Sequence, residues 1–395
     1  MNSHEPHQAY MSLALSQAQE ALFITSPNPR VGCVITSPRG EILGLGHTQA
    51  AGQAHAEVMA LRDASEKGHS VKGSSVYVTL EPCAHTGRTP PCCDALIHAG
   101  VREVFVSLID PNPLVAGQGI EKLRAHGVTV HIGLGAEKAQ TLNIGFLKRM
   151  QLHTPWIRSK IAASIDGHTA TDSGVSQWIT SQAARSDGHA YRARACCILT
   201  GIGTLLVDDP SLDVRAVPTP RQPDLVVLDS GLRTPLDANI FRPKRRTYIY
   251  CSMQCDPQSH ELIYPENQVQ ARALRQKVQA LNQLGAVVLG QPIVHPQLDL
   301  TFVMKDLARL QMNEVHVEAG AILNGGLLKE RLVDELVLYM APSWLGSGKA
   351  MSDMPLTQTL ADVQQFSWHD VTRIDNDLRL TLRRKPLPSI SAKVP

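Results

Sequence analysis

The sequence lacks the features that mark several large classes of protein. Aromatic residues make up only 4% of its 395 residues, charged residues only 19%, and the formal net charge is +2. The longest apolar run, at residues 195–207, is too short and too rich in glycine and threonine to span a bilayer. The N-terminus is polar, without the apolar stretch that a signal peptide needs. We therefore expect a cytoplasmic protein whose partners include neither a membrane nor a nucleic acid.

The 38 basic residues are spread along the chain, and the cysteines are few. One dense basic cluster, RPKRRTY at residues 242–248, is short and has no aromatic residues interleaved with its basic ones. Such a cluster is typical of a solvated face, with nucleic-acid binding as the alternative. Eight cysteines are too few for a disulfide scaffold in a chain of this length. In a reducing compartment, clustered cysteines are more often metal ligands or free thiols.

The length of the chain exceeds what one hydrophobic core usually supports, so we expect two domains, possibly three. In the first 150 residues, apolar patterns of helical and strand period alternate, which indicates a layered α/β domain. The predicted helices are 8–23, 54–67, 92–100 and 119–126, and the predicted strands are 31–36, 41–47, 75–80, 103–109 and 128–133.

A second α/β domain is predicted after a basic helix end and a proline at position 155, which places the domains at 1–152 and 153–395. Its candidate strands are 156–164, 195–203, 224–230, 245–251, 285–290, 314–320 and 335–342. The segment 253–300 as a whole reads as irregular, 347–362 as loop-rich, and the tail 385–395 as fraying.

One constellation in the first domain carries the residue types of a catalytic zinc site. His55 and Glu57 lie at a predicted helix start, Cys83 follows a predicted strand, and Cys92 opens the next helix. A catalytic zinc takes three protein ligands and keeps the fourth position for water, which one histidine and two cysteines satisfy. Glu57 is then free to carry a proton between that water and a leaving amine. The order H-x-E followed by P-C and a later cysteine is that of the zinc deaminases.

Two other interpretations of these residues are possible. His55 and the cysteines could be buried or surface residues that merely coincide in the sequence. Alternatively, Cys93 could complete a closed four-ligand site in a zinc-stabilised binding protein, although such a site has no use for Glu57. We assign Cys93 a packing role.

Two glycine-containing segments of the second domain are candidates for cofactor binding. GIGTLLVDDPSLDVR at 201–215 lacks the third glycine of a dinucleotide fingerprint and is weak by itself. EAGAILNGGLL at 318–328 leads from a strand through glycines into a helix, whose N-terminal N–H groups can bind a diphosphate. A glycine-rich turn with a packing role is the alternative.

The first domain closely resembles the deaminase half of the bifunctional riboflavin-biosynthesis deaminase/reductase family. The resemblance rests on PNPRVG, GHTQAAGQAHAE, EPCAHTGRTPPCCDAL, DPNPLVAGQGI and NIGFLKRM, including the eight-residue gap between Cys83 and Cys92. It implies a cytidine-deaminase-like three-layer fold, in which zinc hydroxide replaces an exocyclic amine of a phosphoribosylated pyrimidine by oxygen. One Zn²⁺ per chain would be bound by His55, Cys83 and Cys92, with Glu57 as the acid/base. The implied substrate contacts are Asn28, His47, His85, Arg88, Asp110 and Asn112.

The second domain resembles the reductase half of the same family, whose fold is similar to dihydrofolate reductase. The motifs are KIAASIDGHTA, SQWITS, RARACCILTGIGTLLVDDPSLDVR, VVLDSGLRTP, VEAGAILNGGLL and LVDELVLYMAP. The resemblance implies hydride transfer from NADPH to C1′ of the ribose, which opens it to a ribityl chain. The implied cofactor contacts are Ala162, Trp178, Thr204, Asp208, Ser230, Gly320, Gly325 and Gly326. The implied substrate contacts are Ser176, Arg192, Leu212, Arg215 and Glu318.

Several points stay open at this level. The proton donor of the reduction is Glu318 or a water held by Asp208, and we expect a homo-oligomer, a dimer or a tetramer. Cys196 and Cys197 stand where the family commonly has an acidic residue before an alanine, a departure that we expect to affect packing. The alternative function is a deaminase whose second domain is not catalytic.

Overall fold

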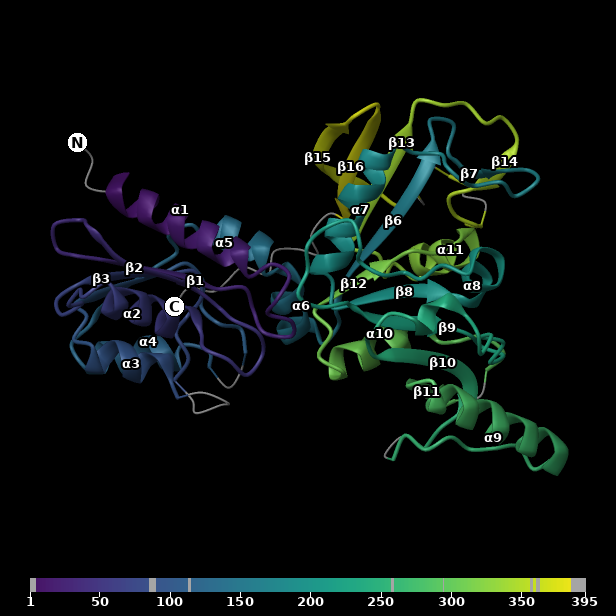
Figure 1. Ribbon diagram of the computed structural model, residues 1–395, viewed down its shortest axis with the longest axis horizontal. Helices are drawn as coiled ribbons and strands as arrows, with labels where there is room; N and C mark the ends of the chain where they lie inside the picture. The colour runs from purple at the N-terminus through teal and green to yellow at the C-terminus, as the bar shows by residue number, and fades with distance from the viewer. Residues whose placement is uncertain are drawn as a thin grey trace. The chain divides into compact units, whose positions relative to one another are not determined.

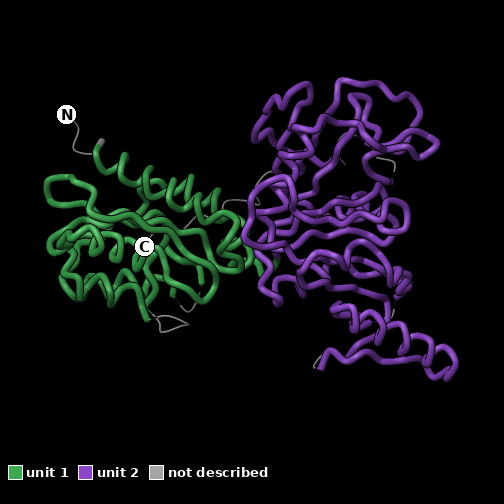
Figure 2. Tube along the Cα trace, viewed as in Figure 1, with its two compact units in different colours: residues 1–154 green, residues 155–395 purple. Residues whose placement is uncertain are grey.

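The computed structural model describes residues 5–84, 90–112, 115–256, 259–293, 295–355, 358–359 and 363–384. The chain divides into two compact units, residues 1–154 and 155–395 (Figure 2). Each unit is built around its own β-sheet (Figure 1). Among the described residues, no helix has the length and apolar character needed to cross a membrane.

Unit 1 contains a five-stranded sheet in the order β2-β1-β3-β4-β5. Its strands are β1 (Gly32–Thr36), β2 (Ile42–His47), β3 (Ser75–Val78), β4 (Glu103–Val106) and β5 (Thr129–Ile132). Strand β1 pairs antiparallel with β2 and β3, whereas β3, β4 and β5 are parallel. The helices are α1 (Glu5–Glu20), α2 (Ala56–Glu66), α3 (Cys92–His98), α4 (Gln118–Ala125), α5 (Ala136–Leu142) and α6 (Ile144–Leu152).

The helices of unit 1 form two layers on opposite faces of this sheet. Apolar side chains of α1 and α5 pack with Val34 and Tyr77 on one face. Those of α2, α3 and α4 pack with Cys33 and Val78 on the other face. Since neighbouring strand residues point to opposite faces, the result is the expected three-layer domain (Figure 1).

Unit 2 contains a nine-stranded sheet in the order β11-β10-β9-β8-β12-β6-β13-β16-β15 and a two-stranded sheet β14-β7. The long sheet is parallel from β11 to β13, and β16 and β15 add to it antiparallel. Its strands are β6 (Trp156–Ser164), β8 (Cys197–Gly201), β9 (Asp224–Leu228), β10 (Thr247–Gln254), β11 (Ala286–Gln291), β12 (Glu314–Val317), β13 (Glu335–Ala341), β15 (Phe366–Ile374) and β16 (Asp377–Arg384). The short strands are β7 (His168–Thr171) and β14 (Gly348–Ala350).

Helices again cover both faces of the long sheet. Val226 belongs to the core formed with α10 and α11, whereas its neighbour Val227 belongs to the core formed with α8 and α9. Ala184 of α7 packs on Val337 and Tyr339 of β13. The helices are α7 (Gln182–Arg194), α8 (Ile202–Asp208), α9 (Gln268–Gln283), α10 (Leu300–Arg309) and α11 (Ala321–Lys329), with a 3-10 turn η1 (Asn239–Phe241).

The prediction that 253–300 is irregular is wrong for α9, which lies within it, whereas β11 agrees with the candidate strand at 285–290. Asn267 caps α9 through its side chain, which accepts hydrogen bonds from two backbone N–H groups. Val278 and Leu281 face the core at helical spacing, while most of the other α9 residues are polar. This narrow apolar stripe left the helix without a clear sequence signal. The β15–β16 hairpin was also missed, and the tail 385–395 lies outside the described residues.

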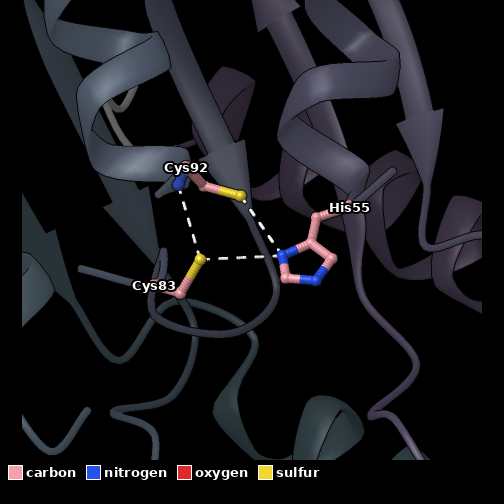
Figure 3. A group of neighbouring side chains, drawn as sticks. All are labelled: His55, Cys83 and Cys92. Atoms are coloured by element: carbon pink, nitrogen blue, oxygen red, sulfur yellow. Dashed lines mark hydrogen bonds between the residues drawn. The ribbon is translucent and has the colours of Figure 1, made fainter. Parts of the chain in front are cut away.

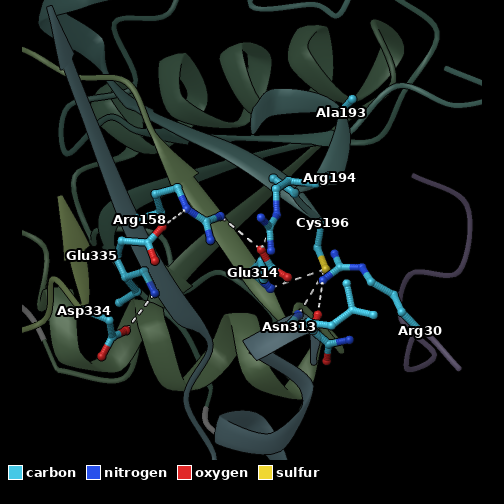
Figure 4. A network of polar contacts seen from close by, with 12 residues as sticks. Arg30, Arg158, Ala193, Arg194, Cys196, Asn313, Glu314, Asp334 and Glu335 are labelled. Atoms are coloured by element: carbon cyan, nitrogen blue, oxygen red, sulfur yellow. Dashed lines mark hydrogen bonds and ion pairs between the residues drawn. The ribbon is translucent and has the colours of Figure 1, made fainter. Parts of the chain in front are cut away.

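A buried ionic network joins the central strands of unit 2 (Figure 4). Arg158 on β6 pairs with Glu335 on β13 and, at 3.0 Å, with Glu314 on β12. Arg383 lies 2.8 Å from Glu335, and Arg194 lies 3.1 Å from Glu314. The side chains of Arg158, Glu314 and Glu335 are only 1–2% exposed. Each buried charge therefore has a partner of opposite sign, as a buried charge requires.

Candidate active sites

The packing of α2 on β2 positions the residues of the predicted zinc site. A Cβ atom on Gly46 would lie 2.4 Å from the Ala56 carbonyl oxygen, so only glycine lets the helix approach this closely. His55 is the N-cap of α2 and Glu57 lies in its first turn, as predicted. Cys92 is the first residue of α3. Two helix starts and the segment after β3 therefore meet at one edge of the sheet.

The three expected ligand residues come together in space (Figure 3). Their ligand atoms all lie within 4.8 Å of one another. His55 Nδ1 is 3.6 Å from Cys83 Sγ and 3.3 Å from Cys92 Sγ, and the Cys92 backbone N–H donates to Cys83 Sγ at 3.4 Å. Among the described residues, no other group of three or more histidine, cysteine or acidic side chains is arranged to hold a metal ion.

This donor set fits zinc. Zinc lies about 2.0 Å from nitrogen and about 2.3 Å from sulfur, so tetrahedral donor atoms are roughly 3.5–3.8 Å apart. The two nitrogen–sulfur separations, 3.6 and 3.3 Å, are close to that range. One histidine and two cysteines leave one coordination position for a water or a substrate, which is the pattern of a catalytic site.

The ionisation of these groups follows from burial and close contact. The hydrogen bond between the two cysteine side chains lowers the pKa of Cys83 to about 4 and raises the pKa of Cys92. Burial raises the pKa of Glu57 to about 7, and the charge of Cys83 adds to this effect. The Glu57 side chain is 3% exposed and close enough to Cys92 for a hydrogen bond. A carboxyl with a pKa near neutrality can both accept and donate a proton.

Cys93 points away from this group. Its Sγ donates to the carbonyl oxygens of Pro82 at 3.2 Å and Gly119 at 3.5 Å, and the side chain is buried. Burial raises the pKa of Cys93 to about 12, so it stays a thiol. These contacts agree with a packing role.

Glu81 is a buried residue that sequence reasoning missed. Its Oε2 accepts the backbone N–H groups of Asp110 at 3.1 Å and Gly117 at 3.0 Å. Its Oε1 accepts those of Gly119 at 2.9 Å and Ile120 at 3.2 Å, in the first turn of α4. The carboxylate is stabilised by these N–H groups and by the helix dipole. In the sequence, only the position of Glu81 directly before Pro82-Cys83 indicated that it belongs to this site.

The expected substrate residues of unit 1 are only partly connected to this centre. Asp110 is held next to Glu81, and its Oδ1 accepts the Asn112 N–H at 2.9 Å. Burial raises the pKa of Asp110 to about 6. Asn28 and His47 make no hydrogen bond to the zinc-type group within the described ranges. His85 and Arg88 lie outside the described residues.

The second candidate site lies at the carboxyl edge of the parallel strands of unit 2. Strands β8, β9, β12 and β6 are parallel, so their carboxyl ends share one edge of the sheet. Strand order reverses beside β8 and β12, which is where open α/β sheets bind ligands. The residues expected at this edge are Ala162 near the end of β6, Thr204 and Asp208 on α8, Ser230 after β9, and Glu318 and Gly320 after β12.

A partly buried ion pair dominates this edge, with each side chain 15% exposed. Arg192 of α7 donates through Nε and a terminal nitrogen to both oxygens of Glu318, the second at 2.9 Å. Burial alone would raise the pKa of Glu318, but Arg192 holds that pKa well below its ordinary value. An ionised Glu318 cannot donate a proton, so the structure argues against it as the proton donor. Burial lowers the pKa of Lys160, whose ammonium interacts with Glu318 and which sequence reasoning missed.

The glycines expected to contact cofactor have different surroundings. Gly320 is the N-cap of α11, and a Cβ there would have no described neighbour within 4 Å. Gly325 and Gly326 lie inside α11 rather than in a turn. A Cβ on Gly325 would lie 2.1 Å from the Asp353 carbonyl oxygen, so this close packing alone requires glycine.

The remaining expected contact residues lie on two segments, 176–178 and 211–215. Trp178 is 66% exposed and stacks against Arg185, whose Cζ is 4.4 Å from the ring centroid, and Ser176 precedes it in the same segment. Leu212 is buried with φ of 47°. Arg215 is exposed and forms an ion pair with Asp213. Cys196 accepts the Asn313 N–H at 3.1 Å, which agrees with a packing role.

Comparison with known protein families gives a match to each unit. Residues 4–108 match the cytidine and deoxycytidylate deaminase zinc-binding region. Residues 155–380 match the RibD C-terminal domain. The two matches occur in the same order as the two candidate sites.

Individual relatives match over nearly the whole chain. The riboflavin biosynthesis protein RibD of Escherichia coli is 44% identical over 94% of this chain and 98% of its own length. The protein of that name from Aquifex aeolicus is 37% identical over 95% and 98%. The structure of Acinetobacter baumannii RibD superposes with a TM-score of 0.84 at 38% identity, covering 97% of this chain and 99% of that one. A Thermotoga maritima structure, named as a diaminohydroxyphosphoribosylaminopyrimidine deaminase/5-amino-6-(5-phosphoribosylamino)uracil reductase, superposes with a TM-score of 0.81 at 28% identity, covering 97% and 99%.

Proposed function

Because the chain belongs to the RibD family of riboflavin biosynthesis proteins, with a zinc-dependent deaminase domain and an NADPH-dependent reductase domain, we propose a specific pair of reactions. Unit 1 deaminates 2,5-diamino-6-ribosylamino-4(3H)-pyrimidinone 5′-phosphate. Unit 2 then reduces the ribose of 5-amino-6-(5-phosphoribosylamino)uracil to a ribityl chain. The observation that carries the proposal is the convergence of His55, Cys83 and Cys92 beside the buried acid Glu57. The deaminase-only alternative is not favoured, since the reductase domain is present.

In unit 1, we assign the ligand role to His55, Cys83 and Cys92. Zn²⁺ at this position supplies an activated water for attack on the pyrimidine ring. Glu57 takes up the proton that this attack releases and delivers it to the leaving amine, for which a pKa of about 7 suits it. Asp110 and Asn112, on the loop that Glu81 holds, contact the substrate, together with Asn28, His47, His85 and Arg88.

In unit 2, NADPH supplies the hydride, so the protein needs no nucleophile of its own. The N-terminus of α11 at Gly320 binds phosphate of the cofactor, because its N–H groups and the helix dipole favour an anion. Cofactor contacts extend to Ala162, Trp178, Thr204, Asp208 and Ser230. Glu318, fully ionised, orients Arg192 rather than donating a proton.

The substrate phosphate of the reduction binds at the loop 211–215. Arg215 is exposed, so its guanidinium can turn from Asp213 to a phosphate. Leu212 adopts a left-handed conformation, and the N–H groups of Ser211, Leu212 and Asp213 have no acceptor among the described residues. Successive free N–H groups in such a turn form an anion-binding concavity. For Arg215→Ala we expect weaker binding of the phosphorylated intermediate, and an unaltered affinity by titration would reject this assignment.

We infer that the protein is a cytoplasmic homo-oligomer. All eight cysteines are free, which suits a reducing compartment. Strand β15 is an edge strand, with Trp368 67% exposed and Val371 57% exposed. An exposed apolar edge strand is a template for pairing with another chain, so we propose a second copy there. Light scattering during gel filtration tests this, with Trp368→Lys expected to shift the mass toward the monomer.

Mass spectrometry of products tests the pair of reactions. The zinc-loaded protein is given the phosphoribosylated diaminopyrimidine with and without NADPH. We expect the deaminated product alone without NADPH, and the deaminated and reduced product with it. Deamination alone under both conditions would overturn the reductase assignment and leave that of unit 1 standing.

A further inference from the structure

One residue of the basic cluster at 242–248 does not face solvent. Arg242, Lys244 and Arg246 are exposed, as the sequence suggests, but the Arg245 side chain turns inward. Its two terminal nitrogens donate to the backbone carbonyl oxygens of Leu212 and, at 2.6 Å, of Ser211. The second nitrogen also reaches the Ile240 carbonyl oxygen at 3.4 Å. The prediction of a solvated face is therefore wrong for Arg245, because the neighbouring loop offers carbonyl groups that a guanidinium can satisfy.

The rest of this loop is held in the same way by side chains from outside it. Arg192 donates to the Asp213 carbonyl oxygen at 2.8 Å. Gln222 accepts the Val214 N–H at 2.7 Å and donates to the Val214 carbonyl oxygen at 2.8 Å. His189 Nδ1 accepts the Arg215 N–H at 3.3 Å. Every residue from 211 to 215 thus has a backbone hydrogen bond to a side chain that lies outside the loop.

We propose that Arg245 is a positioning residue for the reductase, which holds the loop 211–215 in the conformation that receives the substrate phosphate. The inference rests on the proposed function of that loop. By binding the carbonyl oxygens of Ser211 and Leu212 from the protein side, Arg245 turns the N–H groups of the same turn toward the ligand. Arg245 also fixes the direction in which the loop backbone orients the Arg215 side chain. Arg245 itself does not touch the substrate.

The energetic reason is preorganisation. A flexible loop of this length would lose conformational entropy on binding, and each residue that is already ordered removes part of that cost. The planar guanidinium can bind two adjacent carbonyl oxygens at once, which a lysine ammonium does less well. Burial lowers the pKa of Arg245 to about 10, so it remains charged in the range where the enzyme is assayed.

A matched pair of variants tests this proposal. Arg245→Gln removes the guanidinium that binds the loop, and Arg242→Gln removes one charge from the same cluster without a hydrogen bond to the loop. The NADPH-dependent reduction is measured with the deaminated intermediate supplied directly. For Arg245→Gln we expect KM to rise about tenfold, the equivalent of one charge-assisted hydrogen bond, with kcat changed less than twofold. The inhibition constant of ribose 5-phosphate should rise by the same factor, and deamination and the KM for NADPH should not change.

The results separate this proposal from the one on which it rests. An unchanged KM and an unchanged inhibition constant in folded Arg245→Gln would overturn it, as would an equal effect of Arg242→Gln. A fall in kcat without a rise in KM would indicate a general structural role and would also overturn it. If Arg215→Ala itself leaves KM unchanged, the phosphate site is wrong, whereas an effect of Arg215→Ala without one of Arg245→Gln rejects only the positioning role. Should Arg245→Gln not fold, Arg245→Lys keeps the charge and should raise KM by a smaller factor.

Discussion

The two candidate sites differ in how their reactive groups are brought together. In unit 1, the ligand residues and Glu57 come from two helix starts and one strand end, within the span 55–92. In unit 2, Arg192 on α7, Arg215 in a loop and Glu318 after β12 are drawn from a span of more than 120 residues. The first site uses three donors, one histidine and two cysteines, around one point. The second uses permanent charges on side chains, in which Arg192 pairs with Glu318 from another element and Arg215 pairs with Asp213 in its own loop.

The difference follows from the chemistry that each site serves. A metal ion concentrates charge at one point, so a few donors at the right distance are enough. A phosphorylated substrate and a dinucleotide are long and anionic, so they need several cations and N–H groups spread over a sheet edge. Cations that are largely removed from water in turn need partners, as the partly buried Arg192–Glu318 pair illustrates. Four experiments test the contrast.

The largest effect is expected for Glu57→Gln. The amide cannot carry the proton, so deamination should fall by roughly 10²- to 10⁴-fold, the usual contribution of a positioned acid/base. Zinc content by atomic emission and reduction of supplied intermediate should stay at wild-type values, because neither depends on Glu57. A wild-type rate of deamination in this variant would contradict the role of Glu57 as the acid/base.

The next effect concerns zinc itself, in the neighbouring pair Cys92→Ser and Cys93→Ser. Cys92 lies in the donor group and Cys93 points to Pro82 and Gly119. We expect bound zinc after gel filtration to fall well below one per chain in the first variant and to stay near one in the second. If Cys93→Ser also lost its zinc, the result would favour the closed four-ligand site.

The ionic network of unit 2 predicts a stability effect that depends on pH. Burial opposes ionisation of Glu335, but Arg158 and Arg383 lower the pKa of Glu335 to about 2. A folded-state pKa below the unfolded value of about 4.3 stabilises the protein above that pH, and the contribution is lost as pH falls toward 2. Glu335→Gln should lower the free energy of unfolding at pH 7 by roughly 3 kcal/mol, at the low end for a broken buried pair since Glu314 still neutralises Arg158.

Urea unfolding between pH 7 and pH 3 measures this effect, with the exposed Glu266→Gln as the control in the same unit. The difference between wild type and Glu335→Gln should shrink as the pH falls. A constant difference across this range would show that packing, rather than the charge of Glu335, stabilises the strands.

The smallest effect is expected for Glu81→Gln. The amide can accept two of the four backbone N–H groups and places its own donors against the other two. The loop that carries Asp110 and Asn112 should loosen, raising the KM for deamination about tenfold, as the loss of a charge-assisted hydrogen bond does. Zinc content and the rate of reduction should not change. The Glu81→Asp variant should recover little of the wild-type KM for deamination, because its side chain is one methylene shorter. A fall in reduction equal to that in deamination would indicate general destabilisation.

Much of unit 1 could be predicted because its signals are local. His55 and Glu57 stand at a helix start that the apolar pattern marks, and Cys92 opens the next helix. The strands of both units follow runs of apolar residues, and most of them were found. The α9 helix was missed because its buried stripe is narrow, and β15 because its residues are largely exposed.

Residues that act through their surroundings could not be found in this way. In the sequence, Glu81 is an acidic residue before a Pro-Cys pair, and Arg245 is one arginine of a basic cluster. The residues that they contact lie in segments up to 39 residues away in the sequence. The ionisation of Glu318 depends on Arg192, which is 126 residues distant. Resemblance to a family named residues of the site, but not which of them are ionised or what holds them.

The sequence by itself determined the two α/β units, the ligand set of the zinc-type site and the acid beside it, because these depend on periodicity and on side-chain type at short spacing. The tertiary structure alone decided which charges are buried, how they pair, and which backbone groups face a ligand. The physical reason is that burial and pairing depend on distances between segments that only packing brings together. The free energy of a charge depends on those distances, whereas the preference for a helix or a strand depends mainly on neighbours along the chain.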